Sequence, residues 1–84
     1  MQQGQFWYVY TLKSLADPDR HYTGFTEDLA QRLGQHNAGK CAHTSKHIPW
    51  RIETAVAFRC RAKALRFEKY LKSASGRAFA SKHF

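Results

Sequence analysis

The sequence predicts an α/β domain in which a small three-stranded antiparallel β-sheet is flanked by helices. Three short segments rich in aromatic and β-branched residues are typical of strands, and two further segments have the spacing of amphipathic helices. The chain has 84 residues, which is room for one core, so we expect one domain over residues 1–84. The predicted order is strand, strand, helix, strand, helix and a short terminal helix.

Residues 6–12 and 21–25 are predicted to form an antiparallel hairpin. The stretch between them contains Asp17 and Pro18, and proline fixes one turn position while it disfavours helix before it. Gly24, inside the second strand, indicates a bulge or a close approach by another part of the chain.

A first helix is predicted to follow, capped by Thr26 and running to about Ala38. Glu27 and Asp28 would lie in its first turn, where acidic side chains suit the helix dipole. Gly39 fits the position just past its end.

The second half of the chain is predicted to contain a strand over residues 51–58 and a helix from residue 61 to about residue 74. Residues 39–50 before them form a basic loop closed by a proline. Strict alternation places the apolar and β-branched strand residues on one face: Ile52, Thr54, Val56 and Phe58. Gly76 is expected to stop the helix, and residues 77–84 to form a short terminal helix.

The composition excludes several classes of protein. With 43% hydrophobic residues the chain is not intrinsically disordered, and no apolar run approaches the length of a membrane span. The first five residues lack the basic and apolar parts of a signal peptide. Two cysteines are too few for a disulfide scaffold, so we expect a reducing, cytoplasmic setting, in association with the nucleoid if the ligand is DNA.

The net charge of +8 is concentrated in one part of the chain. Residues 1–31 carry two basic and four acidic side chains, whereas residues 32–84 carry twelve basic and two acidic ones. Such an excess is typical of a polyanion binder, although charge alone does not separate DNA, RNA and an acidic partner. We expect the DNA backbone to be contacted by basic residues of this part: Lys40, Lys46, Arg51, Lys69 and Lys72.

Glu68 does not fit a plain core helix. Helical spacing places it in the middle of an apolar stripe formed by Ala64, Leu65, Phe67 and Leu71. An ionised carboxylate there is costly unless a cation or several donors meet it. The alternatives are a salt bridge to a buried residue, a metal ligand and a different helix phase; a single carboxylate suits Mg²⁺.

Four other residues are candidates for one site. Arg32 and His36 lie one turn apart on the first predicted helix, where an arginine fork can grip phosphate and a histidine can move a proton. Tyr10 and Tyr22 belong to the two paired strands, so all four side chains could converge on one end of the sheet. Taken singly, each tyrosine is more often a core aromatic.

A zinc site is the other metal hypothesis. Its ligands would come from Cys41, His43, His47 and Cys60, but the Cys-x-His-x₃-His spacing is not that of a standard zinc finger. Ordinary loop residues are the favoured interpretation.

Together these residues resemble the GIY-YIG endonuclease family. Tyr8-Val9-Tyr10 occupies the first motif and Tyr22-Thr23-Gly24 the second, while Asp28 to Asn37 is similar to the helix with the catalytic arginine. Glu68 falls where the metal-binding glutamate of the family belongs. The resemblance covers about residues 6–76, and it is strongest to small bacterial single-domain members and to nuclease domains of excision-repair and structure-specific endonuclease subunits. Phe25 stands where the excision-repair branch has a lysine.

The resemblance implies a GIY-YIG fold and metal-dependent hydrolysis of DNA phosphodiesters in repair, recombination or processing. It implies Tyr10 as general base with Tyr22 assisting, Arg32 on the phosphate, and Glu68 holding one Mg²⁺ or Mn²⁺. His36 would position the water or act as the base instead. Because the reference pKa of tyrosine is near 10, we expect the site to lower the pKa of Tyr10 or to deprotonate it only transiently.

The sequence leaves two alternatives to a nuclease. One is a non-catalytic nucleic-acid binding module of the same fold, and the other is a small basic protein that assembles with ribosomal RNA or a protein. A nuclease of this size could also need a protein partner to select its target, and we expect no membrane association.

Overall fold

A three-stranded antiparallel sheet is the centre of the molecule, and the computed structural model describes residues 5–84. Strand β1 (Trp7–Ser14) is the middle strand, with β2 (His21–Thr26) and β3 (Trp50–Phe58) at the two edges. The β1–β2 register is continuous from Tyr8–Thr26 to Lys13–His21. The predicted hairpin is therefore confirmed.

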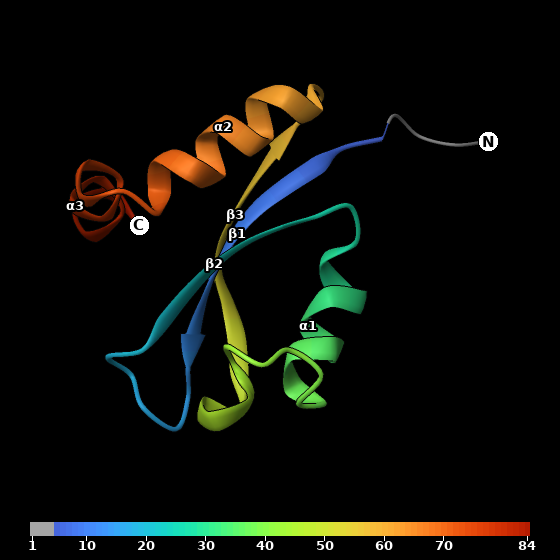
Figure 1. Cartoon of the computed structure of the whole chain (residues 1–84), viewed down its shortest axis with the longest axis vertical. Helices are drawn as coiled ribbons and strands as arrows, with labels where there is room; N and C mark the ends of the chain where they lie inside the picture. The colour runs from blue at the N-terminus through green and yellow to red at the C-terminus, as the bar shows by residue number, and fades with distance from the viewer. Residues whose placement is uncertain (1–4) are drawn as a thin grey trace.

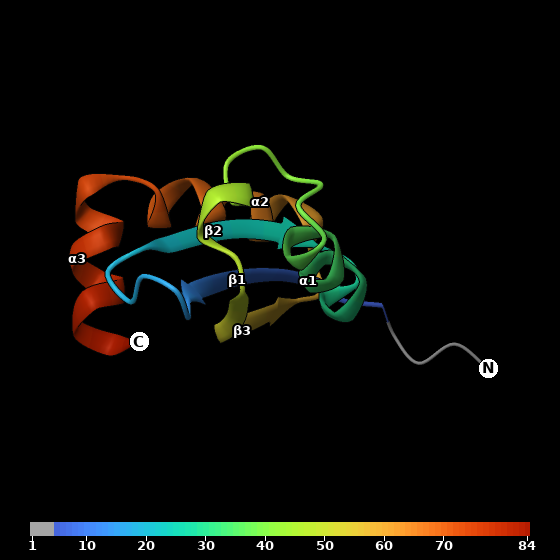
Figure 2. The same cartoon turned by 90° about the horizontal axis from the view of Figure 1, so that it is seen from below.

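Helices cover both faces of this sheet. They are α1 (Leu29–Asn37), α2 (Arg61–Leu71) and α3 (Ala74–His83), with a 3₁₀ turn at Ser45–His47. Figure 1 shows α1 and α2 on opposite sides of the sheet, and Figure 2 shows the three strands side by side. The predicted α/β class is confirmed. Within residues 5–84, no helix is both long enough and apolar enough to span a membrane.

Each face of β1 contributes to its own apolar core, as alternation along a strand requires. On the α2 side the buried residues are Val9, Ala64 and Leu71. On the α1 side they are Tyr10, Leu12 and Trp50. Two thin cores therefore stabilise this domain, and one of them contains the candidate tyrosine Tyr10.

A β-bulge in β3 overturns one prediction about that strand. Thr11 pairs with Thr54, but its neighbour Leu12 pairs with Ile52, so Glu53 is an extra residue on β3. Because side chains alternate, the insertion places Ile52 on the α1 side and Thr54 on the α2 side. The prediction that these two residues share a face is wrong.

The start of α1 also differs from the prediction. The capping residue is Asp28, whose side chain accepts a hydrogen bond from the Gln31 amide at 3.0 Å, and the first turn contains no acidic residue. Thr26 cannot begin the helix because it still pairs with Tyr8 in the sheet. Gly39 follows the helix with φ of 77°, which confirms its predicted role at the end.

Gly76 lies inside α3 and does not stop α2. Helix α2 ends at Leu71, and Ser73 caps the next helix by accepting a hydrogen bond from the Gly76 amide. A Cβ on residue 76 would collide with the backbone at Tyr70 and Leu71, so glycine allows α3 to fold back closely on α2. The predicted terminal helix is therefore longer than expected and begins three residues earlier.

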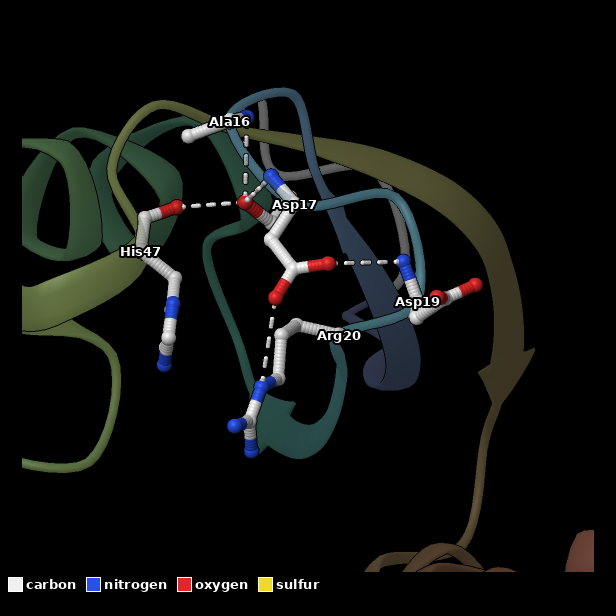
Figure 3. A network of polar contacts seen from close by, with 6 residues as sticks. Ala16, Asp17, Asp19, Arg20 and His47 are labelled. Carbon is white, nitrogen blue, oxygen red and sulfur yellow. Dashed lines mark hydrogen bonds and ion pairs between the residues drawn. The ribbon is translucent and has the colours of Figure 1, made fainter.

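A network of polar contacts orders the connection between β1 and β2 (Figure 3). The buried Ser14 hydroxyl donates to the His47 carbonyl at 2.7 Å and accepts from the amides of Ala16 and Asp17. Arg20 lies 3.5 Å from the carboxylate of Asp17 in the same turn. The hairpin end is thereby fixed to the loop before β3.

Replacing Thr11 with valine is expected to stabilise the protein. Thr11 is 6% exposed, and its hydroxyl has no hydrogen-bond partner among the described residues. A methyl group of the same shape removes the cost of this unpaired hydroxyl, so we expect the free energy of unfolding to rise by about 1 kcal/mol. Urea denaturation measures it, with Thr54→Val, a half-buried neighbour in register, as the control. A lower stability for Thr11→Val would contradict this assignment.

Candidate active site

The buried side chain of Tyr10 is at the centre of the candidate site. It lies on the middle strand, is 2% exposed, and is paired in register with Gly24 of β2. A Cβ at position 24 would collide with the Tyr10 ring and hydroxyl. Glycine in the second motif therefore leaves room for the tyrosine of the first motif to lie across the edge strand. The close approach predicted for Gly24 is confirmed.

A chain of hydrogen bonds runs from Tyr10 into helix α1. The Tyr10 hydroxyl lies 2.9 Å from Nε2 of His36, which is fully buried, and His36 Nδ1 lies 2.8 Å from Oγ1 of Thr44. The single hydroxyl proton of Thr44 is donated to the Cys41 carbonyl, at 3.3 Å. Thr44 therefore accepts from Nδ1–H, which leaves Nε2 to accept the proton of Tyr10 O–H. The chain points in one direction, from Tyr10 towards the imidazole.

Burial controls the pKa values of this pair. Burial raises the pKa of Tyr10 to about 12, and the neighbouring Arg32 guanidinium opposes this by a smaller amount. Burial also lowers the pKa of His36 below 6.5, and Arg32 acts in the same direction. Both side chains are thus neutral near pH 7. The expectation that the site lowers the pKa of Tyr10 is not met in this structure, because desolvation outweighs the effect of the arginine.

Arg32 and Tyr22 complete the part of the site on the α1 side of the sheet. Arg32 lies one turn before His36, is half-buried, and donates from Nη1 to Gln35 Oε1 at 2.8 Å. The Tyr22 ring is half-buried, and its centroid lies 5.1 Å from that of the His36 ring. Tyr10, Tyr22, Arg32 and His36 are therefore brought together, as the sequence predicted, over the α1 side of the sheet at the β2 edge.

Glu68 approaches the same edge from α2. Its side chain is 20% exposed, and its Oε2 lies 3.3 Å from Nζ of Lys72. That ammonium lies 5.6 Å from the centroid of the Tyr22 ring, so Tyr22 lies near both His36 and Lys72. Since β2 is an edge strand, helices on opposite faces of the sheet can contribute to one site.

The predicted environment of Glu68 is partly correct. Ala64 and Leu71 are buried and Phe67 is half-buried, so the carboxylate does lie in an apolar stripe. Its partner is the exposed Lys72 of the next turn, and the salt bridge to a buried residue that we considered is not formed. A half-buried oxygen donor with one salt-bridge partner suits a cation such as Mg²⁺, which binds through one or two carboxylates, several waters and substrate phosphates.

The zinc hypothesis fails in this fold. Within residues 5–84, no three His, Cys, Asp or Glu side chains are grouped so that they could hold a metal ion. Cys60 is exposed before α2, far along the chain from the loop that contains Cys41, His43 and His47. These residues are therefore ordinary loop and cap residues.

The other predicted DNA contacts are exposed but belong to different elements. Lys40 follows α1, Lys46 lies in the 3₁₀ turn, Arg51 is on β3 and Lys69 is on α2. Among the five predicted contacts, Lys72 is the one that lies at the cluster of candidate catalytic residues.

Sequence reasoning missed the residues that hold His36 in place. Thr44 is fully buried, and its carbonyl accepts a hydrogen bond from Trp50 Nε1 at 2.8 Å. The Asn37 side chain accepts from the Trp50 amide at 2.6 Å and donates to its carbonyl at 3.0 Å. The available signal was weak: a polar side chain at the last position of a helix and a tryptophan at the start of a strand.

The chain belongs to the GIY-YIG family of nuclease domains. Residues 6–82 match the GIY-YIG catalytic domain, which covers both tyrosines, the arginine and the glutamate described above. The resemblance predicted from the motifs is therefore confirmed.

Similar proteins occur in bacteria and among endonuclease subunits. A UPF0213 protein of Cupriavidus pinatubonensis is 40% identical over 80 residues, which are 90% of this chain and 87% of that protein. The structure-specific endonuclease subunit SLX1 of Candida dubliniensis is 41% identical over 82% of this chain and 27% of its own length. A homolog of that subunit in Giardia intestinalis is 38% identical over 73% of this chain and 18% of its own length. The chain thus corresponds to nearly all of the bacterial relative and to one part of each subunit.

The lowered pKa of His36 predicts a pH dependence of stability. Its pKa is below 6.5 in the folded state and near 6.5 when unfolded, so the unfolded chain binds more protons as the pH falls below 6.5. The stabilising contribution of neutral His36 to the free energy of unfolding is complete above pH 6.5. It is lost as the pH falls towards the pKa that His36 has in the folded state. We expect His36→Gln to flatten this loss between pH 7 and 5 in urea titrations. His43→Gln, at an exposed position, should keep the wild-type slope; equal slopes for all three proteins would contradict the assignment.

Gly24→Ala is expected to damage the site by displacing Tyr10. The new Cβ collides with the Tyr10 ring, so we expect a loss of about 1–3 kcal/mol in the free energy of unfolding. Gly34→Ala is the matched control, because no atom lies within 4 Å of its new Cβ and α1 should gain about 0.5–1 kcal/mol. Denaturation midpoints compare the two variants. Equal stability of Gly24→Ala and the wild type would show that position 24 does not need glycine.

Proposed function

We propose that this protein is a divalent-metal-dependent DNA endonuclease that hydrolyses phosphodiester bonds. The observation that carries the proposal is the hydrogen-bonded chain Tyr10–His36–Thr44, with Arg32 and Tyr22 against it at the edge strand. Membership of the GIY-YIG family supports the nuclease class. The rival function, a non-catalytic binding module, gives no reason for Arg32, Tyr22 and Glu68 to gather at one edge of the sheet.

Tyr10 is proposed as the general base, with His36 accepting the tyrosine proton. A preformed phenolate is expensive, because burial raises the pKa of Tyr10 to about 12 and lowers the pKa of His36, and both changes favour the neutral pair. The proton of Tyr10 therefore moves to His36 Nε2 as the attacking water gives its own proton to the phenol oxygen. In this way the base acts at neutral pH without a resting phenolate.

The remaining side chains are proposed to bind the phosphate. Arg32 supplies a planar donor set for phosphate oxygens as negative charge builds up in the transition state. Tyr22, which lies near both His36 and Lys72, orients the water or the phosphate. Glu68 would hold the cation, Mg²⁺ or Mn²⁺, which supplies positive charge at the scissile phosphate. Lys72 is then free to leave Glu68 and contact the substrate.

The proposed cellular role is DNA repair, recombination or processing. The SLX1 relatives are named as structure-specific endonuclease subunits, which supports a branched or otherwise structured DNA as substrate and a protein partner that selects it. The exposed lysines and arginines of residues 32–84 would then hold the DNA backbone.

A cleavage assay tests this function. Labelled duplex, branched, damaged and single-stranded DNA are incubated with the protein and Mg²⁺ or Mn²⁺. We expect cleavage by the wild type, and rates lower by about 10²–10³ for Tyr10→Phe, Arg32→Ala and Glu68→Ala. Lys82→Ala, which removes an exposed cation from α3, should cleave at nearly the wild-type rate.

Binding is measured on the same proteins in EDTA. Glu68→Ala should bind DNA at least as tightly as the wild type, because it removes a negative charge near the phosphate. If no protein cuts any of the substrates and all bind DNA equally, the domain is a binding module. Much tighter binding of RNA than of DNA at matched salt would instead indicate an RNA partner.

A further inference from the structure

A concave surface lies beside the candidate active site. We call it the α3 cleft; it is a cavity of about 770 Å³ between the sheet, the C-terminal end of α2 and helix α3. In Figure 1, α3 and the connection between β1 and β2 lie at the left of the molecule, and residues of both line the cleft. A volume of this size is typical of sites for small molecules or cofactors.

The cleft contains one cation that no acidic side chain neutralises. Of the basic residues lining it, Arg20 lies against Asp17 and Lys72 against Glu68. Arg77, on α3, has no ion pair or side-chain hydrogen bond with any residue in the described part of the chain.

The acidic side chains of the cleft leave that cation available. Asp19 lines the cleft at the hairpin end, and Glu53, the extra residue of the bulge, lies 3.6 Å from His21 across the sheet. Neither carboxylate forms an ion pair with Arg77, so this guanidinium stays free for an anionic group. A phosphate group suits that unpaired guanidinium, which can bind two phosphate oxygens at once.

Two further features suit a nucleotide better than a bare anion. Thr11 lines the cleft from the middle strand and is only 6% exposed. Its hydroxyl has no hydrogen-bond partner among the described residues. Aromatic rings of Tyr22 and Phe84 also line the cleft, and Phe84 is 37% exposed. Aromatic faces next to cations are the usual means of holding a base and its phosphate.

The cleft shares two residues with the candidate active site. Tyr22 and Lys72 line it, and the same two side chains face His36 and Glu68 in the site. A strand whose phosphate lies at Arg32 and Glu68 would therefore have its neighbouring nucleotide near Lys72 and Arg77.

We propose that the α3 cleft is a subsite for the nucleotide next to the phosphate that is cleaved. Arg77, with Lys72, binds the flanking phosphate, the hydroxyl of Thr11 forms a hydrogen bond to the nucleotide, and the base lies against Phe84 or Tyr22. The inference rests on the proposed function, because it assumes that the bound nucleotide is part of a DNA strand. A free nucleotide has the same chemistry and is the other possible source.

Binding in EDTA tests the subsite without cleavage. Thymidine 5′-monophosphate and a labelled oligodeoxynucleotide are titrated separately into the ¹⁵N-labelled protein, and affinity for the oligonucleotide is measured by fluorescence anisotropy. We expect amide shifts in Thr11, Tyr22 and Arg77 with both ligands, and oligonucleotide affinity about tenfold weaker for Arg77→Ala. Lys82→Ala is the matched control, because it removes the same charge from the same helix outside the cleft.

Thr11→Val adds a second variant that keeps the shape of the cleft. If its hydroxyl contacts the nucleotide, affinity falls by several-fold although the fold becomes more stable. Amide shifts with thymidine 5′-monophosphate but not with the oligonucleotide would show that the cleft binds a free nucleotide. They would overturn the proposal that the bound nucleotide belongs to a DNA strand. No shift in the cleft with either ligand, or equal affinities for Arg77→Ala and Lys82→Ala, would overturn the subsite.

Cleavage measured on the same variants separates the two proposals. If Arg32→Ala and Glu68→Ala lose cleavage while Arg77→Ala matches Lys82→Ala, the endonuclease is supported and the subsite is wrong. If no variant cleaves DNA but nucleotide binding still depends on Arg77, the cleft binds a nucleotide without a cleavage site beside it, and the proposed function is wrong.

Discussion

The hydrogen bond between the Tyr10 hydroxyl and His36 Nε2 joins the middle strand to helix α1 inside the core. Both groups are almost completely buried, so each needs a partner, and an unpaired one would cost about 1–3 kcal/mol. Thr44 supplies the partner for the second ring nitrogen, and it gives its own proton to the Cys41 carbonyl. The Tyr10–His36 bond therefore holds α1 against the sheet, while Thr44 fixes the histidine tautomer and ties the loop after α1 to the same chain of hydrogen bonds.

The edge position of β2 decides how the two halves of the site meet. Because Gly24 has no side chain, the Tyr10 ring can extend across β2. Tyr22, on the same strand, lies near both the His36 ring of α1 and Lys72, which follows α2. A central strand would be covered on both sides by neighbours, whereas an edge strand lets α1 and α2 reach one place from opposite faces.

Charge has two roles in this small domain. Most basic side chains are exposed and dispersed, which suits contacts with a nucleic-acid backbone that do not depend on base sequence. Near the edge strand, Lys72 forms an ion pair with Glu68, and a substrate phosphate could replace Glu68 as the partner of Lys72. Arg77 has no such partner in residues 5–84, and it lies in the cleft that shares Tyr22 and Lys72 with the site.

The sequence by itself determined the class of fold and the types of residue at the site. Local patterns were sufficient because strand composition and the one-turn spacing of Arg32 and His36 depend on near neighbours in the chain. The tertiary structure alone decided the rest. The bulge at Glu53 reverses the faces of Ile52 and Thr54, and the raised pKa of Tyr10 arises from burial. Strand register and burial depend on what packs against a residue from distant parts of the chain, which no local pattern records.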